Sequence, residues 1–122
     1  MTSPDVPALS VVVPVFNERD NVGPLIAEVV AALRGRITFE IVYVDDCSKD
    51  DSFATLQQLM QTTPELRVLG HVTQSGQSTA IRNGVKAARG DWIATVDGDG
   101  QNDPADLPKL LAARDAAVKE PG

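Results

Sequence analysis

Two aspartates near the end of the chain are the residues whose type and spacing best suit chemistry. Asp97 and Asp99 stand in a glycine-rich segment, where Gly98 and Gly100 let the backbone turn sharply and let a ligand approach closely. Carboxylates so placed can direct their oxygens at one point, and Mg²⁺ and Mn²⁺ prefer oxygen ligands. Gln101 can add a carbonyl oxygen. We therefore take Asp97, Asp99 and Gln101 as candidate metal ligands, with Asp97 and Asp99 as the candidate catalytic residues.

Other interpretations of this motif can be tested on the sequence. An EF-hand loop counted from Asp97 needs glycine at its sixth position and glutamate at its twelfth, but Asn102 and Pro108 stand there. A phosphatase of the haloacid-dehalogenase type has threonine or valine where Gln101 stands, and carries the motif on its first strand. The EF-hand is excluded and the phosphatase is disfavoured. A plain turn made by Asp and Gly remains an alternative.

Two further acidic segments follow apolar runs. Asp45 and Asp46 either form a turn into a helix, supported by Ser48, or present a carboxylate to the N–H of a nucleobase. Asn17 and Glu18 carry the same ambiguity, because Asn17 is a competent helix N-cap.

Weaker candidates lie in the second half of the chain. Gly76 precedes a predicted helix and could present backbone N–H groups to an anion. Arg82 on that helix is either a solvated charge or a phosphate ligand. We expect Cys47 and His71 to be structural, because neither has a catalytic partner that the sequence reveals.

The elements that must position these residues alternate along the chain. Short apolar runs rich in β-branched residues predict strands at residues 9–13 (ended by Pro14), 39–44, 66–72 and 92–96. Helical spacing of apolar residues predicts helices over 22–33, 53–60 (capped by Ser48 or Asp50) and 75–88, and Asp103–Pro104 opens a fourth. This order indicates an α/β fold with a mostly parallel sheet and helices on both faces. Ligands bind beyond the carboxyl ends of such strands, where residues 14–18, 45–46 and 97–99 would gather.

Composition sets broad limits on function. The 122 residues suit one soluble domain, with 43% hydrophobic and 23% charged residues. The formal net charge of −6 argues against nucleic acid as a partner, although a bound cation would still allow a phosphate-bearing ligand. The single cysteine excludes an internal disulfide and favours a reducing compartment. No apolar run suits a membrane span or a signal peptide, so we expect a cytoplasmic protein.

Taken together, the motifs resemble the nucleotide-binding half of family 2 glycosyltransferases, and most of all the dolichol- and polyprenyl-phosphate sugar transferases. The resemblance covers residues 9 to about 118, and its matching segments are residues 11–18, 44–50, 76–84, 88–91 and 97–104. One departure is Cys47, which replaces a glycine common after the Asp-Asp pair.

The resemblance implies a fold and an activity. The fold is the Rossmann-like, GT-A nucleotide-binding half, and the activity is metal-dependent, inverting transfer of a sugar from a UDP- or GDP-sugar. Pro14, Phe16, Glu18 and Asp46 would line the base and ribose pocket, while Asp97, Asp99 and Gln101 would hold Mg²⁺ or Mn²⁺ on the diphosphate. Together with Asp45, Gly76 and Arg82 from the residue analysis, these make the candidate nucleotide site. The implied acceptor is a polyprenyl or dolichyl phosphate, which would bring the protein to the cytoplasmic face of a membrane.

The family's domain continues beyond the length of this chain. We therefore expect residues 1–122 to be the nucleotide-sugar-binding part of a truncated domain that lacks the acceptor half. The alternative is a non-catalytic half-domain that binds a nucleoside diphosphate and a metal. An exposed sheet edge would also make a homo-oligomer or a domain swap plausible.

Overall fold

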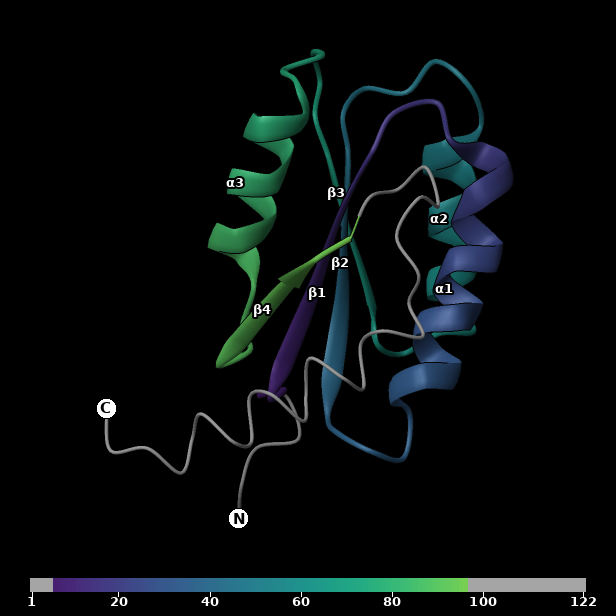
Figure 1. Cartoon of the computed structure of the whole chain (residues 1–122). Helices are drawn as coiled ribbons and strands as arrows, with labels where there is room; N and C mark the ends of the chain where they lie inside the picture. Colours follow the sequence, from purple (N-terminus) through teal and green to yellow (C-terminus); the bar gives the residue numbers. More distant parts are fainter. Residues whose placement is uncertain (1–5, 97–122) are drawn as a thin grey trace.

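The structure, a computed structural model, describes residues 6–96 (Figure 1). Its elements alternate along the chain as β1 (Leu9–Val15), α1 (Arg19–Leu33), β2 (Phe39–Asp45), α2 (Ser52–Met60), β3 (Leu66–Gly70), α3 (Gln77–Ala87) and β4 (Trp92–Thr95). The strands form one sheet in the order β3-β2-β1-β4, and every neighbouring pair is parallel. The predicted α/β architecture is confirmed.

The strand order determines which face each helix covers. The chain moves from β1 to β2 to β3 in one direction and then returns past β2 and β1 to place β4 on the far side of β1. Because crossovers between parallel strands are right-handed, reversing the direction moves the connecting helix to the opposite face. Figure 1 accordingly shows α1 and α2 on one face of the sheet and α3 on the other. The reversal creates a switch point between β1 and β4, the position where ligands bind in open parallel sheets.

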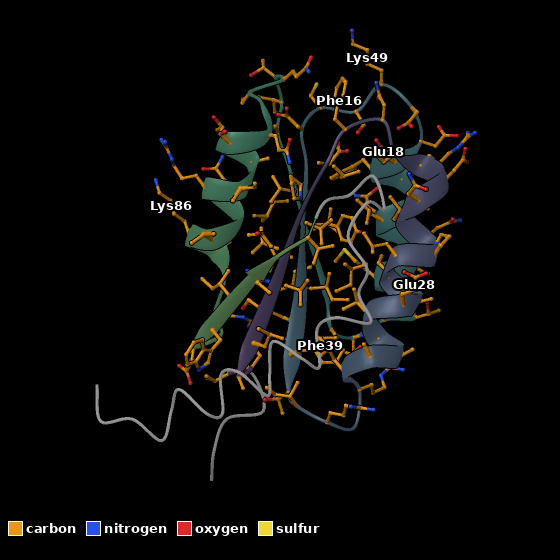
Figure 2. All side chains as sticks on the ribbon, viewed as in Figure 1. Phe16, Glu18, Glu28, Phe39, Lys49 and Lys86 are labelled. Atoms are coloured by element: carbon orange, nitrogen blue, oxygen red, sulfur yellow. The ribbon has the colours of Figure 1, made fainter. Side chains whose placement is uncertain are left out.

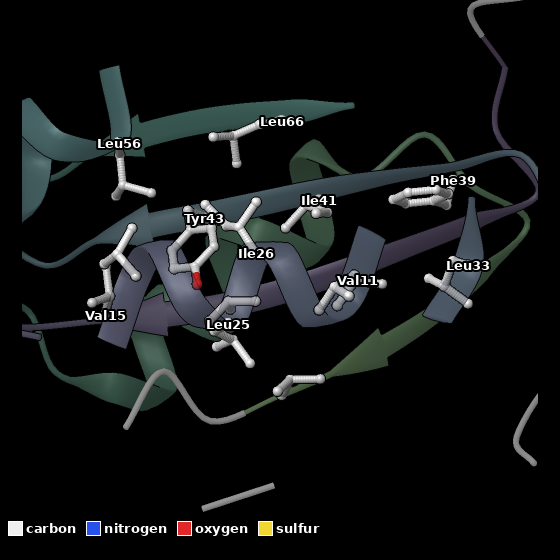
Figure 3. Packing of buried hydrophobic residues seen from close by; sticks show 14 of the residues in the cluster. Val11, Val15, Leu25, Ile26, Leu33, Phe39, Ile41, Tyr43, Leu56 and Leu66 are labelled. Atoms are coloured by element: carbon white, nitrogen blue, oxygen red, sulfur yellow. The ribbon is translucent and has the colours of Figure 1, made fainter. Parts of the chain in front are cut away.

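The core is divided between the two faces in unequal parts. The larger cluster joins alternate residues of the two central strands to α1, with Leu25 and Ile26 packed over the sheet (Figure 3). The smaller cluster joins Val12, Val42 and Val44 to Ala80 of α3. Helix α3 therefore buries little apolar surface of its own.

A buried acid at the start of β2 links the sheet to the end of α3. Glu40 is 2% exposed and accepts hydrogen bonds from Ser10 Oγ at 2.6 Å, Arg67 Nη1 at 2.8 Å and Arg89 N–H at 2.7 Å. Burial alone would raise the pKa of Glu40, but these hydrogen bonds outweigh it and hold the pKa below its ordinary value. Arg67 also donates to the carbonyl of Ala87, the last residue of α3, at 2.9 Å.

Strand β1 differs from its predicted bounds. It continues through Pro14 to Val15, so the expectation that Pro14 ends the strand is wrong. The carbonyl of Val12 accepts from Val96 and that of Val15 accepts from Asp46, so by alternation the backbone at Pro14 faces the β4 side. The ladder with β4 ends at Val12, and the missing N–H of proline therefore removes no hydrogen bond to β2.

Other boundaries shift as well. β3 stops at Gly70 rather than at residue 72, and α3 begins at Gln77 rather than at residue 75. Helix α2 has Asp51 at its N-cap, so neither predicted cap stands there, although the preceding Asp50 accepts the N–H of Ser52 at 2.9 Å. The predicted helix at Asp103–Pro104 lies outside the described residues.

Candidate functional site

The segments at the carboxyl ends of β1, β2 and β3 lie together at one end of the sheet. We call this the C-terminal end of the sheet, and it comprises residues 16–18, 45–51 and 71–76. Figure 2 shows Phe16, Glu18 and Lys49 at this end, away from Phe39 at the start of β2. Parallel strands bring their carboxyl ends to one side, which is why acidic segments distant in the sequence become neighbours here.

Asn17 links the loop after β1 to the loop after β2. Its backbone lies in the left-handed region, with φ of 53°, which Asn tolerates better than most residues. Its N–H donates to Ser48 Oγ at 2.9 Å, and its side-chain oxygen accepts the N–H of Lys49 at 2.7 Å. The cap of α1 is Glu18, without a side-chain capping bond, so the interpretation of Asn17 as an N-cap is wrong.

Asp45 turns back onto its own loop. Its buried carboxylate accepts the N–H of Ser48 at 3.1 Å and also the hydroxyl of Ser48. Ser48 Oγ in turn accepts from Asn17, so Asp45, Ser48 and Asn17 form one hydrogen-bonded chain between the two loops. This arrangement matches the turn interpretation of Asp45 and orders the ends of β1 and β2 relative to each other.

Asp46 points to the other side of the sheet and holds the start of α3. Its Oδ1 accepts the N–H of Ser75 at 2.7 Å, and its Oδ2 accepts the N–H of Gly76 at 2.8 Å. Gly76 is the N-cap of α3 and has φ of 98°, a conformation that glycine adopts without strain. Asp46 is only 4% exposed, so its role in the fold is to fix the entry to α3.

His71 completes this arrangement between Asp46 and α3. Its Nδ1 lies 2.8 Å from Asp46 Oδ1, and its Nε2 lies 2.9 Å from the side-chain nitrogen of Asn83 on α3. An ionised carboxylate only accepts hydrogen bonds, so Nδ1 must carry the proton and donate. In the neutral ring Nε2 then accepts from the Asn83 amide, which assigns His71 to the Nδ1–H tautomer.

These contacts keep Asp46 ionised. Burial raises the pKa of Asp46, but the hydrogen bonds from His71, Ser75 and Gly76 together lower it below the ordinary aspartate value. A carboxylate has about four lone-pair positions, of which these donors occupy three. The remaining acceptor position belongs to Oδ2.

The other predicted nucleotide ligands differ in how open they are. Pro14 is buried in β1 opposite Val44, whereas Phe16 and Glu18 are half-buried in the loop that follows. Glu18 Oε2 accepts from the side chain of Asn21 at 2.7 Å. Arg82 is exposed on α3 and makes no ion pair with any described residue. Among these predicted nucleotide ligands, the side chains that are accessible to a ligand are therefore those of Phe16, Glu18 and Arg82.

Cys47 adopts φ of 62°, in the left-handed region. This explains why a glycine would suit the position after the Asp-Asp pair, because an L-residue pays a steric cost there. Its Sγ lies 3.5 Å from the carbonyl oxygen of Val72.

The predicted metal ligands Asp97, Asp99 and Gln101 lie outside the described residues. The described chain ends at Val96, whose N–H donates to Val12 O at 3.0 Å beside the switch point. Within residues 6–96, no group of three His, Cys, Asp or Glu side chains could hold a metal ion.

The sequence analysis named Ser48 as support for the turn at Asp45 and expected His71 to be structural, but it identified the partners of neither, and it missed Asn83. Ser48 follows Asp45 at the spacing of an Asx turn, which is a usable signal. His71 directly follows a predicted strand, so the topology alone brings it to the same end as Asp46. Asn83 gave no signal, because its role depends on which face of α3 meets the sheet.

No helix of the described chain has the length and the apolar character that crossing a membrane requires.

Among proteins of known function, the chain is 40% identical over 106 residues to the dodecaprenyl-phosphate galacturonate synthase of Rhizobium johnstonii, covering 85% of this chain and 31% of that protein. The chain thus spans about a third of the length of this relative.

Two solved structures resemble the fold. S. aureus TarS 1–349 in complex with UDP is 27% identical, with a TM-score of 0.75 over 88% of this chain and 32% of that one. The mannosyltransferase PcManGT from Pyrobaculum calidifontis, in complex with GDP-Man and Mn²⁺, has a TM-score of 0.76 over 97% of this chain and 34% of that one, at 22% identity. Both support the GT-A fold that the sequence implies. The family model "Glycosyl transferase family 2" matches residues 10–118, nearly the whole chain, and the protein therefore belongs to glycosyltransferase family 2.

Proposed function

We propose that residues 1–122 form the nucleotide-sugar-binding part of a metal-dependent glycosyltransferase domain. The observation that carries the proposal is the convergence of three ordered polar loops on the C-terminal end of a parallel sheet, next to its switch point. Such a place suits a nucleotide, because backbone N–H groups and helix N-termini meet there.

The donor is a nucleoside diphosphate sugar carrying uracil or guanine. TarS bound to UDP and PcManGT bound to GDP-Man support both bases. Phe16 and Glu18 flank the base and ribose next to Pro14, and Asp46 offers its remaining Oδ2 lone pair to a base N–H. On the other side, Asp45 orders the loop, while Gly76 at the N-cap of α3 and Arg82 in the middle of this helix face the phosphates.

A divalent cation, Mg²⁺ or Mn²⁺, completes the site. Asp97, Asp99 and Gln101 offer two carboxylates and an amide oxygen, a donor set that suits a hard cation. When bound, the cation supplies charge neutralisation for the departing nucleoside diphosphate. The chain needs such help, because Asp and Glu exceed Lys and Arg by 17 to 11 and would otherwise repel a diphosphate.

The acceptor is a polyprenyl phosphate, and transfer inverts the anomeric centre. The named activity of the Rhizobium relative, a dodecaprenyl-phosphate galacturonate synthase, supports this acceptor class. A lipid phosphate lies at a membrane surface, so the protein works there as a peripheral partner of the cytoplasmic face.

Calorimetric titration of UDP and GDP into the chain tests donor and metal together. We expect binding with Mn²⁺ and at least tenfold weaker binding with EDTA, and Asp97→Asn should lose the metal-dependent part. Glu28→Gln, which removes one exposed acid from α1, is the control and should bind as the wild type does. Equal affinity with and without the metal would refute the metal role. If neither UDP nor GDP binds, the proposed donor class is refuted.

Mass spectrometry of a short polyprenyl phosphate incubated with the chain and with UDP- and GDP-sugars tests the transfer of the sugar.

A further inference from the structure

We propose that His71 is a positioning residue for the nucleotide, acting as an imidazole bridge that holds Asp46 and the start of α3 in their binding arrangement. The inference rests on the proposed function, because it concerns the same site. His71 itself need not touch the ligand. It acts through Asp46, whose carboxylate lies 2.8 Å away, while Asn83, 2.9 Å away on the other side of the ring, contacts the ring itself.

The loop between β3 and α3 depends on this bridge for its order. Residues 72–76 are all exposed, and the carboxylate of Asp46 accepts the N–H groups of both Ser75 and Gly76. A loop that is already ordered does not have to lose backbone entropy when a ligand arrives, which strengthens binding without adding a contact. The orientation of the Asp46 carboxylate therefore influences nucleotide affinity even where the fold survives.

His71 fixes that orientation from one side. Its ring is 13% exposed and Asp46 is 6% exposed, both as side chains, so water competes little for their hydrogen bond. With Oδ1 occupied by His71 and Ser75 and one position of Oδ2 by Gly76, an acceptor position remains at Oδ2, which the proposed function gives to a base N–H. Without the imidazole, only the backbone N–H groups of Ser75 and Gly76 orient the carboxylate.

Two substitutions of similar polarity separate the two sides of the bridge. The amide nitrogen of asparagine is attached to Cγ, as Nδ1 of histidine is, so His71→Asn retains a donor to Asp46 and loses the link to Asn83. Glutamine extends its amide to the position of Nε2, so His71→Gln loses the Asp46 donor. We expect nucleotide affinity within about threefold of wild type for His71→Asn and roughly tenfold weaker for His71→Gln, the usual effect of one hydrogen bond to a charge.

The chain has a single histidine, which makes the bridge directly observable. Nitrogen-15 NMR of the imidazole in the full chain should show Nδ1 protonated and Nε2 unprotonated at neutral pH. Addition of UDP or GDP with Mg²⁺, which is diamagnetic, should shift these signals. A protonated Nε2 with a bare Nδ1 would overturn the bridge without reference to any nucleotide.

Stability must be separated from positioning. Leu33→Ala removes buried apolar contacts at the end of α1, on the face of the sheet opposite α3, and serves as the control, with lower stability but unchanged nucleotide affinity. Equal affinities of His71→Asn and His71→Gln, measured below their melting temperatures, would overturn the positioning role while leaving the donor site intact. A wild-type chain that binds no nucleotide would instead overturn the proposed function, and the positioning role with it.

Discussion

Helix α3 packs directly against the sheet at Gly84, and we predict that Gly84→Ala destabilises the fold. A Cβ added at Gly84 would overlap Cγ1 of Val12 well inside 3.0 Å and would meet Cγ2 of Val44 at 3.1 Å. Both valines belong to the small cluster on this face, and both lie in the two central strands, which have little room to move. The helix must therefore shift outward.

Two opposing effects determine the sign of the stability change caused by Gly84→Ala. In a solvent-facing helix position, replacing glycine by alanine stabilises by about 1 kcal/mol. Overpacking a core costs about 1–3 kcal/mol, and here the overlap is severe and involves β-branched side chains on a rigid sheet. We therefore expect a net loss of about 2 kcal/mol, a fall in melting temperature of roughly 8 °C for a chain of this size. Because α3 begins at the site, the outward shift should also weaken nucleotide binding.

Urea denaturation of a double-mutant cycle measures this directly. Val12→Ala removes the methyl group that the new Cβ would overlap, so the double variant should cost at least about 1 kcal/mol less than the sum of the two single variants. If the cost of the double variant equals the sum of the two single costs within about 0.5 kcal/mol, the added Cβ at position 84 does not contact the side chain of Val12. A stabilised Gly84→Ala variant would refute the close packing of α3.

Three other substitutions test single features by the same denaturation assay. Tyr43→Phe should stabilise by about 1 kcal/mol, because the buried Tyr43 hydroxyl has no hydrogen-bond partner among the described residues; a loss of stability would indicate one. Cys47→Gly should be about 1 kcal/mol more stable than Cys47→Ala, because only glycine adopts φ of 62° without strain, and equal stability would contradict this. Glu40→Gln should cost about 3 kcal/mol at pH 7. Because the pKa of Glu40 is lowered, its carboxylate stabilises the fold fully when the pH is above its ordinary pKa of 4.5, and this stabilisation is lost as the pH falls below that value. The cost of the substitution should therefore shrink in acid.

The sequence predicted the fold well because its two central strands are mostly apolar and buried on both faces. Residues 9–13 and 39–44 allow no amphipathic helix, and the alternation with helical patterns leaves a parallel sheet as the answer. What the pattern could not supply was the position of strand ends. Pro14 indicates a break by its own chemistry, and only the short ladder with β4 explains why the strand continues through it.

The site was predictable in its location and less so in its internal contacts. The topology alone brings Asp45 and Asp46 to one end, but it does not reveal that the first turns toward Ser48 and the second toward α3. That division follows from the alternation of side chains along β2, which places successive residues on opposite faces. The partnership of His71 with Asn83 could not be predicted, because it depends on the rotation of α3 about its own axis.

The contacts of α3 explain why polar residues matter so much for this site. The helix buries only Ala80 and Gly84, too little apolar surface to fix its position by the hydrophobic effect alone. Polar contacts hold both its ends instead: Asp46 binds the N–H groups at its start, and Arg67, paired with Glu40, binds the carbonyl at its end. Hydrogen bonds depend on direction as well as distance, whereas the small apolar contact of α3 does little to fix the position of the helix along the sheet. The geometry of the nucleotide site therefore depends on two buried carboxylates at opposite ends of the same sheet.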